Sequence, residues 1–195
     1  MTVLDAARVA VGGVTIGLLA GRLLAENPSH LERLRPSYWR RIAAKMGRRG
    51  WARLAGWSAC VLVLCILATS LVSLLLARLQ VEVMKPEEDL MRKLGERWRW
   101  GLLVLVLGLP ILEEWVFRGI LMDELVRMGA SRAWAVAVSA LAFAAFHLSN
   151  PGAGPGIVLV VLPAGVLLGV CYLRAGLAGS ILSHAFYNLV IFLSW

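Results

Sequence analysis

Charged residues are scarce in this chain. Only 16% of its 195 residues are Asp, Glu, Lys or Arg, whereas 59% are hydrophobic and the mean hydropathy is +0.76. An average soluble domain has about 25% charged residues. The composition therefore excludes an ordinary soluble globular domain and indicates that lipid is the solvent. A span needs about 20 apolar residues, so we predict a single membrane domain over residues 1–195.

Cysteine is also scarce, and the motifs of several enzyme classes are missing. Cys60, Cys65 and Cys171 all lie inside apolar runs, which predicts small buried hydrophobic residues rather than disulfides or metal ligands. The chain has no HExxH motif, no internal repeat and no low-complexity tract. These absences exclude a disulfide-stapled scaffold and a metalloprotease of the HExxH type.

Basic residues give the chain a net charge of +8, and they gather beside the apolar runs. Residues 26–56 interleave arginines and a lysine with Tyr and Trp, as is typical of chain at a lipid headgroup interface. We therefore predict anionic lipids, and no nucleic acid, as partners. If residues 6–24 cross the membrane, residues 26–56 should be cytoplasmic and residues 80–98 external. The expected location is the cytoplasmic membrane of a prokaryote.

The predicted fold is all-α, a polytopic transmembrane helical bundle of five to six spans plus an amphipathic surface helix. The amphipathic helix is predicted over residues 80–98, and Gly13, Gly17 and Gly21 predict close contact of the first span with another helix. The first span, residues 6–24, is the weakest. The predicted spans are residues 6–24, 57–77, about 98–128, 133–148, 156–174 and 177–195.

A set of polar side chains interrupts the later spans. A charge near the bilayer centre costs about 2.5–3.5 kcal/mol on insertion scales, so such residues persist mainly where they have a function. Glu114 and Arg118 are four residues apart and should pair on one helix face. Glu113 is then rotated by about 100° and is free to face a cavity. The members of this set are Glu113, Glu114, Arg118, His147, His184 and Asn188.

The same four-residue spacing recurs on two further helices. It joins Phe143 to His147 and His184 to Asn188, so three helices can direct polar faces at one small wet pocket. Pro110 should bend the first of them, because it lacks an amide hydrogen. Each residue alone has a structural explanation, such as an ion pair or hydrogen bonds between helices. Packing alone, however, does not require a second unpaired acid beside two imidazoles and an amide.

These motifs also resemble a known family. Residues 113–118 have the form EExxxR, residues 143–147 the form FxxxH, and residues 184–188 the form HxxxN. Their order is similar to that of the CPBP family of CAAX-prenyl-protease and bacteriocin-processing (Abi) membrane proteins. The resemblance covers roughly residues 100–195, the motif-bearing core, and residues 1–99 correspond to the variable N-terminal part of that family.

The resemblance implies an intramembrane endopeptidase of the glutamate type. Glu113 would be the general base, His147 would hold the same water, and His184 with Asn188 would donate to the oxyanion. Structural support would come from Glu114, Arg118 and Phe143. No metal or cofactor is expected; zinc is the competing chemistry.

Two other classes stay open for the same polar set. A proton- or ion-coupled transporter also needs intramembrane acids and histidines. A non-catalytic scaffold or chaperone of the same fold would keep the helices without the chemistry. For the peptidase, the expected substrate is a peptide held at the membrane, such as a lipidated C-terminus, a sorting anchor or a peptide precursor.

Overall fold

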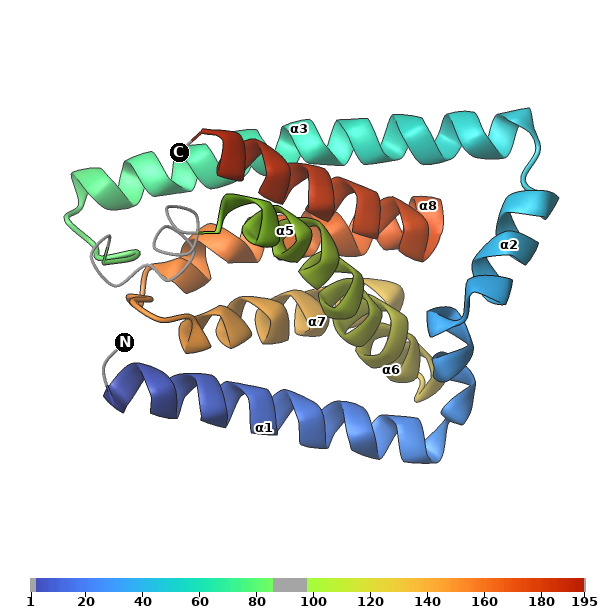
Figure 1. Cartoon of the computed structure of the whole chain (residues 1–195), viewed down its shortest axis with the longest axis horizontal. Helices are drawn as coiled ribbons and strands as arrows, with labels where there is room; N and C mark the ends of the chain where they lie inside the picture. Colours follow the sequence, from blue (N-terminus) through green and yellow to red (C-terminus); the bar gives the residue numbers. More distant parts are fainter. Residues whose placement is uncertain (1–2, 86–97, 195) are drawn as a thin grey trace.

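The computed structural model describes residues 3–85 and 98–194, and every regular element in this part is a helix (Figure 1). The predicted all-α class is confirmed. The α-helices are α1 (Val3–Glu26), α2 (Pro36–Lys45), α3 (Arg48–Arg78), α5 (Arg99–Glu114), α6 (Asp123–Arg127), α7 (Arg132–Phe146) and α8 (Ile157–Leu193). The other helical elements are the 3-10 helix η1 (Pro28–Leu34), the π-helix η2 (Trp115–Met122) and the 3-10 turn η3 (His147–Ser149).

Five helices are long and apolar enough to cross a membrane. The longest, α8, contains a break at Gly176, whose φ of 72° and ψ of −173° lie in a region that glycine adopts readily. The chain reverses direction at Gly176, so the two legs of α8, residues 157–175 and 177–193, are antiparallel (Figure 1). The predicted spans 156–174 and 177–195 therefore correspond to the two legs of α8, and the structure agrees with the prediction of five to six spans. The chain is an integral membrane protein.

The second crossing begins earlier than the sequence predicts. We predict a span over residues 57–77, but α3 starts at Arg48 and continues to Arg78. Hydropathy detects the apolar middle of such a helix, not the basic turns that extend it beyond the hydrocarbon. Of the basic segment, residues 26–56, only the part before α3 lies outside the long helices, where it forms η1 and α2.

Helix α8 lies at the centre of the bundle, packed against α3, α5 and α7. One core cluster joins Val61 and Cys65 of α3 to Leu168 and Cys171 of α8. Cys65 and Cys171 are buried and free, as predicted, but the prediction is wrong for Cys60, which is exposed.

Hydrogen bonds fasten helix α1 near both of its ends. Near its start Arg8 donates to the carbonyl of Ala153 (3.2 Å), and just past its end Asn27 donates to Glu124 (2.7 Å). The predicted close contact at Gly13, Gly17 and Gly21 is wrong within the described residues, since no atom lies within 4 Å of a Cβ built at any of them. Gly12, on another face of α1, is the glycine that lies against Ser149.

Residues 81–85 are extended and pair with the loop between α7 and α8. Lys85 donates its backbone N–H to Gly152, and Gly154 donates to Val83, each at 2.9 Å. The predicted helix over residues 80–98 is therefore wrong for residues 81–85, because backbone pairing with this loop replaces the local helical pattern. Residues 86–97, the rest of that prediction, lie outside the described part.

Candidate active site

The helix that carries the acidic motif changes its geometry at that motif. Pro110 lies inside α5, and directly after Glu114 the backbone passes into the π-helix η2. A π-helix is a wide turn that occurs frequently at functional sites. The sequence correctly predicts continuous helix through this region, but hydropathy carries no signal for its π-helical part.

The predicted pair of Glu114 with Arg118 is confirmed. Nη1 of Arg118 donates to Oε1 of Glu114 at 2.7 Å, and both side chains are 0% exposed. Nη2 of Arg118 donates to the carbonyl of Gly165 at 2.9 Å, which ties η2 to α8. Two charges that leave water together need such mutual contacts, so this pair fixes the helix that bears Glu113.

His184 lies between the two glutamates. Its Nδ1 is 2.9 Å from Oε1 of Glu114, and its Nε2 is 3.6 Å from Oε2 of Glu113. The Glu113 side chain is 21% exposed and makes no hydrogen bond to any residue that the structure describes. Glu113 is thus the unpaired acid that the spacing predicts, and it is directed at an imidazole rather than at lipid.

His147 is held in one orientation by its own helix. It follows α7 as the first residue of η3, and its Nδ1 lies 2.8 Å from the carbonyl oxygen of Phe143. A carbonyl only accepts, so Nδ1 carries a hydrogen, and the neutral ring presents a lone pair at Nε2. His147 can therefore accept a proton from a water molecule.

Phe143 packs against both imidazoles. Its ring centroid is 4.6 Å from that of His147 and 5.6 Å from that of His184, each in an edge-to-face arrangement. On Phe143 the guanidinium of Arg118 also stacks, 4.4 Å from the centroid. The phenyl ring thus contacts the side chains of His147, His184 and Arg118. Such contacts fit the structural role predicted for Phe143.

A small cavity of about 50 Å³ lies among these groups. His147, His184 and Asn188, which we predict to work together, all line it. Glu113 is not part of its lining and reaches the site through His184. One water in the liquid occupies about 30 Å³, so the cavity has room for one or two waters.

Sequence reasoning missed the wall that α3 contributes to this cavity. Thr69 lines it together with Tyr187 of α8. Thr69 donates to the carbonyl of Cys65 (2.8 Å), and Tyr187 donates to Thr69 (3.1 Å). Since each hydroxyl has one hydrogen, Tyr187 offers only lone pairs to the cavity. An isolated Thr in an apolar span was the signal that could have revealed this wall.

The described residues do not provide a metal-binding set. Within residues 3–85 and 98–194, no three His, Cys, Asp or Glu side chains are placed so as to hold one ion together. The polar groups that line the cavity are imidazole, carboxamide and hydroxyl groups, and the Glu113 carboxylate contacts one of these imidazoles, that of His184. Such a set can accept a proton from water and donate hydrogen bonds to an oxygen that becomes negative.

Comparison with known proteins agrees with this geometry. Residues 95–190 match the family model described as type II CAAX prenyl endopeptidase Rce1-like. Comparison with curated proteins and with solved structures gives no match. The match includes all three motifs, and the resemblance to CAAX-type proteases predicted from them is confirmed. Over these residues the chain is similar to the Rce1-like family of type II CAAX prenyl endopeptidases.

Proposed function

We propose that this protein is an intramembrane endopeptidase that hydrolyses a peptide bond of a membrane-held substrate, with Glu113 as the general base. The observation that carries the proposal is the contact of an unpaired glutamate with an imidazole that borders a water-sized cavity. The other acids of this region, Glu114, Asp123 and Glu124, each accept at least two hydrogen bonds from described residues. Glu113 accepts none from them, so both of its oxygens can accept a proton.

The attacking water is held by two acceptors. Glu113 takes one of its protons, while the lone pair at Nε2 of His147 accepts a hydrogen bond from the other. The oxygen then attacks the carbonyl carbon of the substrate. When the carbon–nitrogen bond breaks, the proton on Glu113 passes to the leaving amine, so the carboxylate is regenerated.

The carbonyl oxygen becomes negative during this attack. Asn188 donates to it through its amide, and His184 donates through Nε2 while Nδ1 donates to Glu114. This role requires a hydrogen on both nitrogens of His184. One donor to an oxyanion is worth about 2.7–4 kcal/mol in other enzymes, so the two donors together lower the barrier substantially.

The substrate class follows from the family and from the place of the site. The cavity is lined by membrane-spanning helices α3, α7 and α8, so a peptide must reach it while held at the bilayer. A prenylated C-terminal segment is the first substrate to test, because the matching family is described by that chemistry. A sorting anchor or a secreted peptide precursor is the other form of membrane-held peptide.

The test uses the full chain in lipid vesicles with a prenylated C-terminal peptide, together with mass spectrometry of membrane-protein termini in cells. Glu113→Gln should lower cleavage by about 10²–10⁴-fold, the typical contribution of a general base. The matched control is Glu26→Gln, which alters an exposed glutamate at the end of α1. It should cleave like the wild type.

Full activity of Glu113→Gln would end the proposal. Cellular complementation by an inactive Glu113→Gln would favour the scaffold or chaperone, and proton flux across the same vesicles without cleavage would favour the transporter. Activity that a chelator removes and zinc restores would assign the reaction to metal chemistry.

A further inference from the structure

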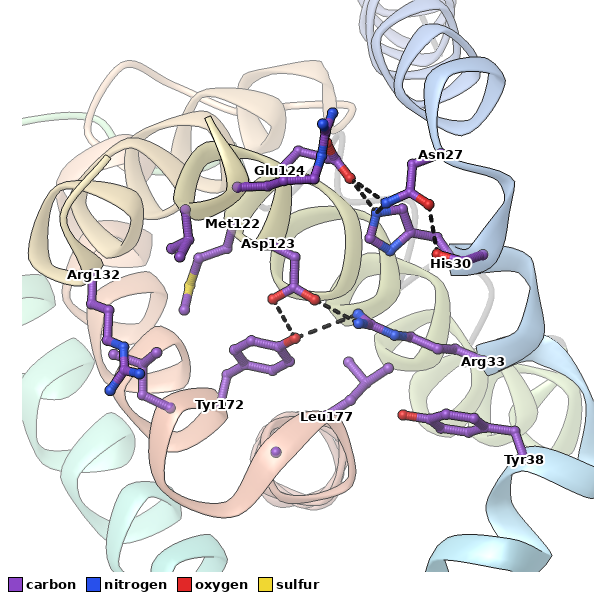
Figure 2. Close-up of a pocket in the computed structure, with 15 residues that line it drawn as sticks. Asn27, His30, Arg33, Tyr38, Met122, Asp123, Glu124, Arg132, Tyr172 and Leu177 are labelled. Atoms are coloured by element: carbon purple, nitrogen blue, oxygen red, sulfur yellow. Dashed lines mark hydrogen bonds and ion pairs between the residues drawn. The ribbon is translucent and has the colours of Figure 1, made fainter. Parts of the chain in front are cut away.

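A second and larger cavity lies at the far end of the bundle from His147. Its volume is about 660 Å³. Its walls come from the turns at this end: η1, the start of α2, the junction of α6 with α7, and the break in α8 at Gly176 (Figure 2). It therefore lies where the helices leave the membrane, on the side of the basic segment.

Both acids of this cavity are already satisfied. Asp123 accepts from Arg33 through one carboxylate oxygen and from Tyr172 through the other, at 2.5 and 2.7 Å (Figure 2). Burial alone would lower the pKa of Arg33, but Tyr172 and Asp123 raise that pKa above its ordinary value, so the guanidinium stays charged. The two oxygens of Glu124 accept from Asn27, His30 and Arg127.

The groups left over are donors. Arg132 makes no hydrogen bond or ion pair with any residue that the structure describes, and neither does the hydroxyl of Tyr38, which points into the cavity (Figure 2). Nδ1 of His30 is buried without a partner among the described residues, but it is not one of the donors, because Nε2 donates to Glu124 and the neutral ring then has a lone pair at Nδ1. With Arg33 and Arg127, the lining carries three guanidinium groups against two carboxylates.

The start of α7 adds to this excess of positive charge. Arg132 is the first residue of α7, a helix of 15 residues with no acid in its first turn. A helix N-terminus presents free N–H groups and favours an anion, whereas a cation there is unfavourable on its own. Ser131 caps one of these N–H groups, that of Trp134, at 3.2 Å, and an anion bound beside Arg132 would offset the positive charge of its guanidinium at this helix end.

A purely structural role does not account for these free donors. The contacts of Arg33 and His30 with Asp123 and Glu124 fasten η1 to α6, and that fastening is complete without Arg132 and Tyr38. The volume of this open pocket and its free donors indicate a ligand with acceptor oxygens.

We propose that this cavity binds the phosphate headgroup of an anionic phospholipid. Arginine forms bidentate hydrogen bonds with phosphate oxygens, and basic pockets between spans at the cytoplasmic side bind such headgroups. Leu173 and Leu177 give the cavity an apolar wall on the α8 side, against which the glycerol and first methylenes of a lipid can pack. The proposal does not depend on peptidase activity.

The experiment measures binding by the full chain in phosphatidylcholine nanodiscs with increasing phosphatidylglycerol. Native mass spectrometry counts the retained lipids, and the thermal midpoint reports stabilisation. Phosphatidylglycerol should be retained and should raise the midpoint of the wild type by several degrees. Arg132→Gln should weaken the apparent affinity about tenfold, as loss of a charge-assisted hydrogen bond does, and Arg132→Lys should keep part of it.

The matched control is Arg40→Gln, which alters an exposed arginine of α2 outside the cavity. It should bind like the wild type, whereas Tyr38→Phe should show a smaller loss than Arg132→Gln. Equal binding by the wild type and by Arg132→Gln would overturn the proposal. Equal stabilisation by millimolar inorganic phosphate in pure phosphatidylcholine would overturn the lipid as the source of the phosphate group.

Discussion

Two pairs of adjacent acids lie on one continuous run of helix, Glu113 with Glu114 and Asp123 with Glu124, and their surroundings differ. In the second pair each of the four carboxylate oxygens accepts from a donor. In the first pair Oε1 of Glu114 contacts both Arg118 and His184. Glu113 has only the 3.6 Å contact with His184.

The difference shows that the donors around a carboxylate, and not its identity, decide what it does. An acid whose oxygens are all bonded has little capacity left to accept a proton, and it serves to hold elements together. Glu124 does this for η1 and α6. Glu114 holds η2 to α8 through Oε1, which contacts Arg118 and His184, while its Oε2 is buried without a partner among the described residues. Glu113 is the member left with free oxygens beside a water-sized cavity.

The largest expected effect concerns the structural member of the first pair. Arg118→Met removes one partner of a fully buried ion pair, so Glu114 stays charged without its cation. We expect a loss of about 3–5 kcal/mol in the free energy of unfolding, measured by thermal unfolding in detergent. Adding Glu114→Gln to Arg118→Met should restore part of the loss, because the stranded charge disappears. An unchanged midpoint for Arg118→Met alone would contradict the structural assignment.

A smaller effect separates the two pairs directly. Glu124→Gln removes charge-assisted bonds from Arg127 and His30, and it should cost about 1–3 kcal/mol. Glu113→Gln removes no hydrogen bond that the structure describes, so its thermal midpoint should stay close to that of the wild type. Both variants are to be unfolded under the same conditions. If Glu113→Gln destabilises the protein as much as Glu124→Gln, the contrast between the pairs fails.

The part of the site that could be predicted depends on helical spacing. Positions four residues apart meet on any helix, so the contacts of Glu114 with Arg118 and of Phe143 with His147 follow from local order. The long apolar helices are predictable for a similar reason, since each needs one apolar run. The chain reversal at Gly176 was also visible as a glycine after a charged residue between two such runs.

The contacts that sequence reasoning missed join residues far apart in the chain. His30 meets Glu124 across 94 positions, and Arg33 meets Asp123 across 90. Glu124 is buried at 1% exposure, although it lies near the end of its helix. Sequence periodicity does not indicate which helix η1 contacts, because tertiary packing determines that contact. Residues 81–85 illustrate the same limit, since their partner is a distant loop.

The smallest effect tests whether the first half of the chain contributes to the site around Glu113. Thr69 lies outside the matched residues 95–190, yet it fixes Tyr187 as an acceptor toward the cavity. Thr69→Val frees the hydroxyl of Tyr187 to turn its hydrogen inward, where it competes with the water for the lone pair of His147. We expect kcat to fall about tenfold, the equivalent of roughly 1.4 kcal/mol, with KM unchanged. Thr69→Ser keeps the hydroxyl and should retain activity, whereas a lesion of packing alone would lower the thermal midpoint of both variants. If folded Thr69→Val has the kcat of the wild type, the prediction is wrong, and the groups that bind the water all lie within residues 95–190.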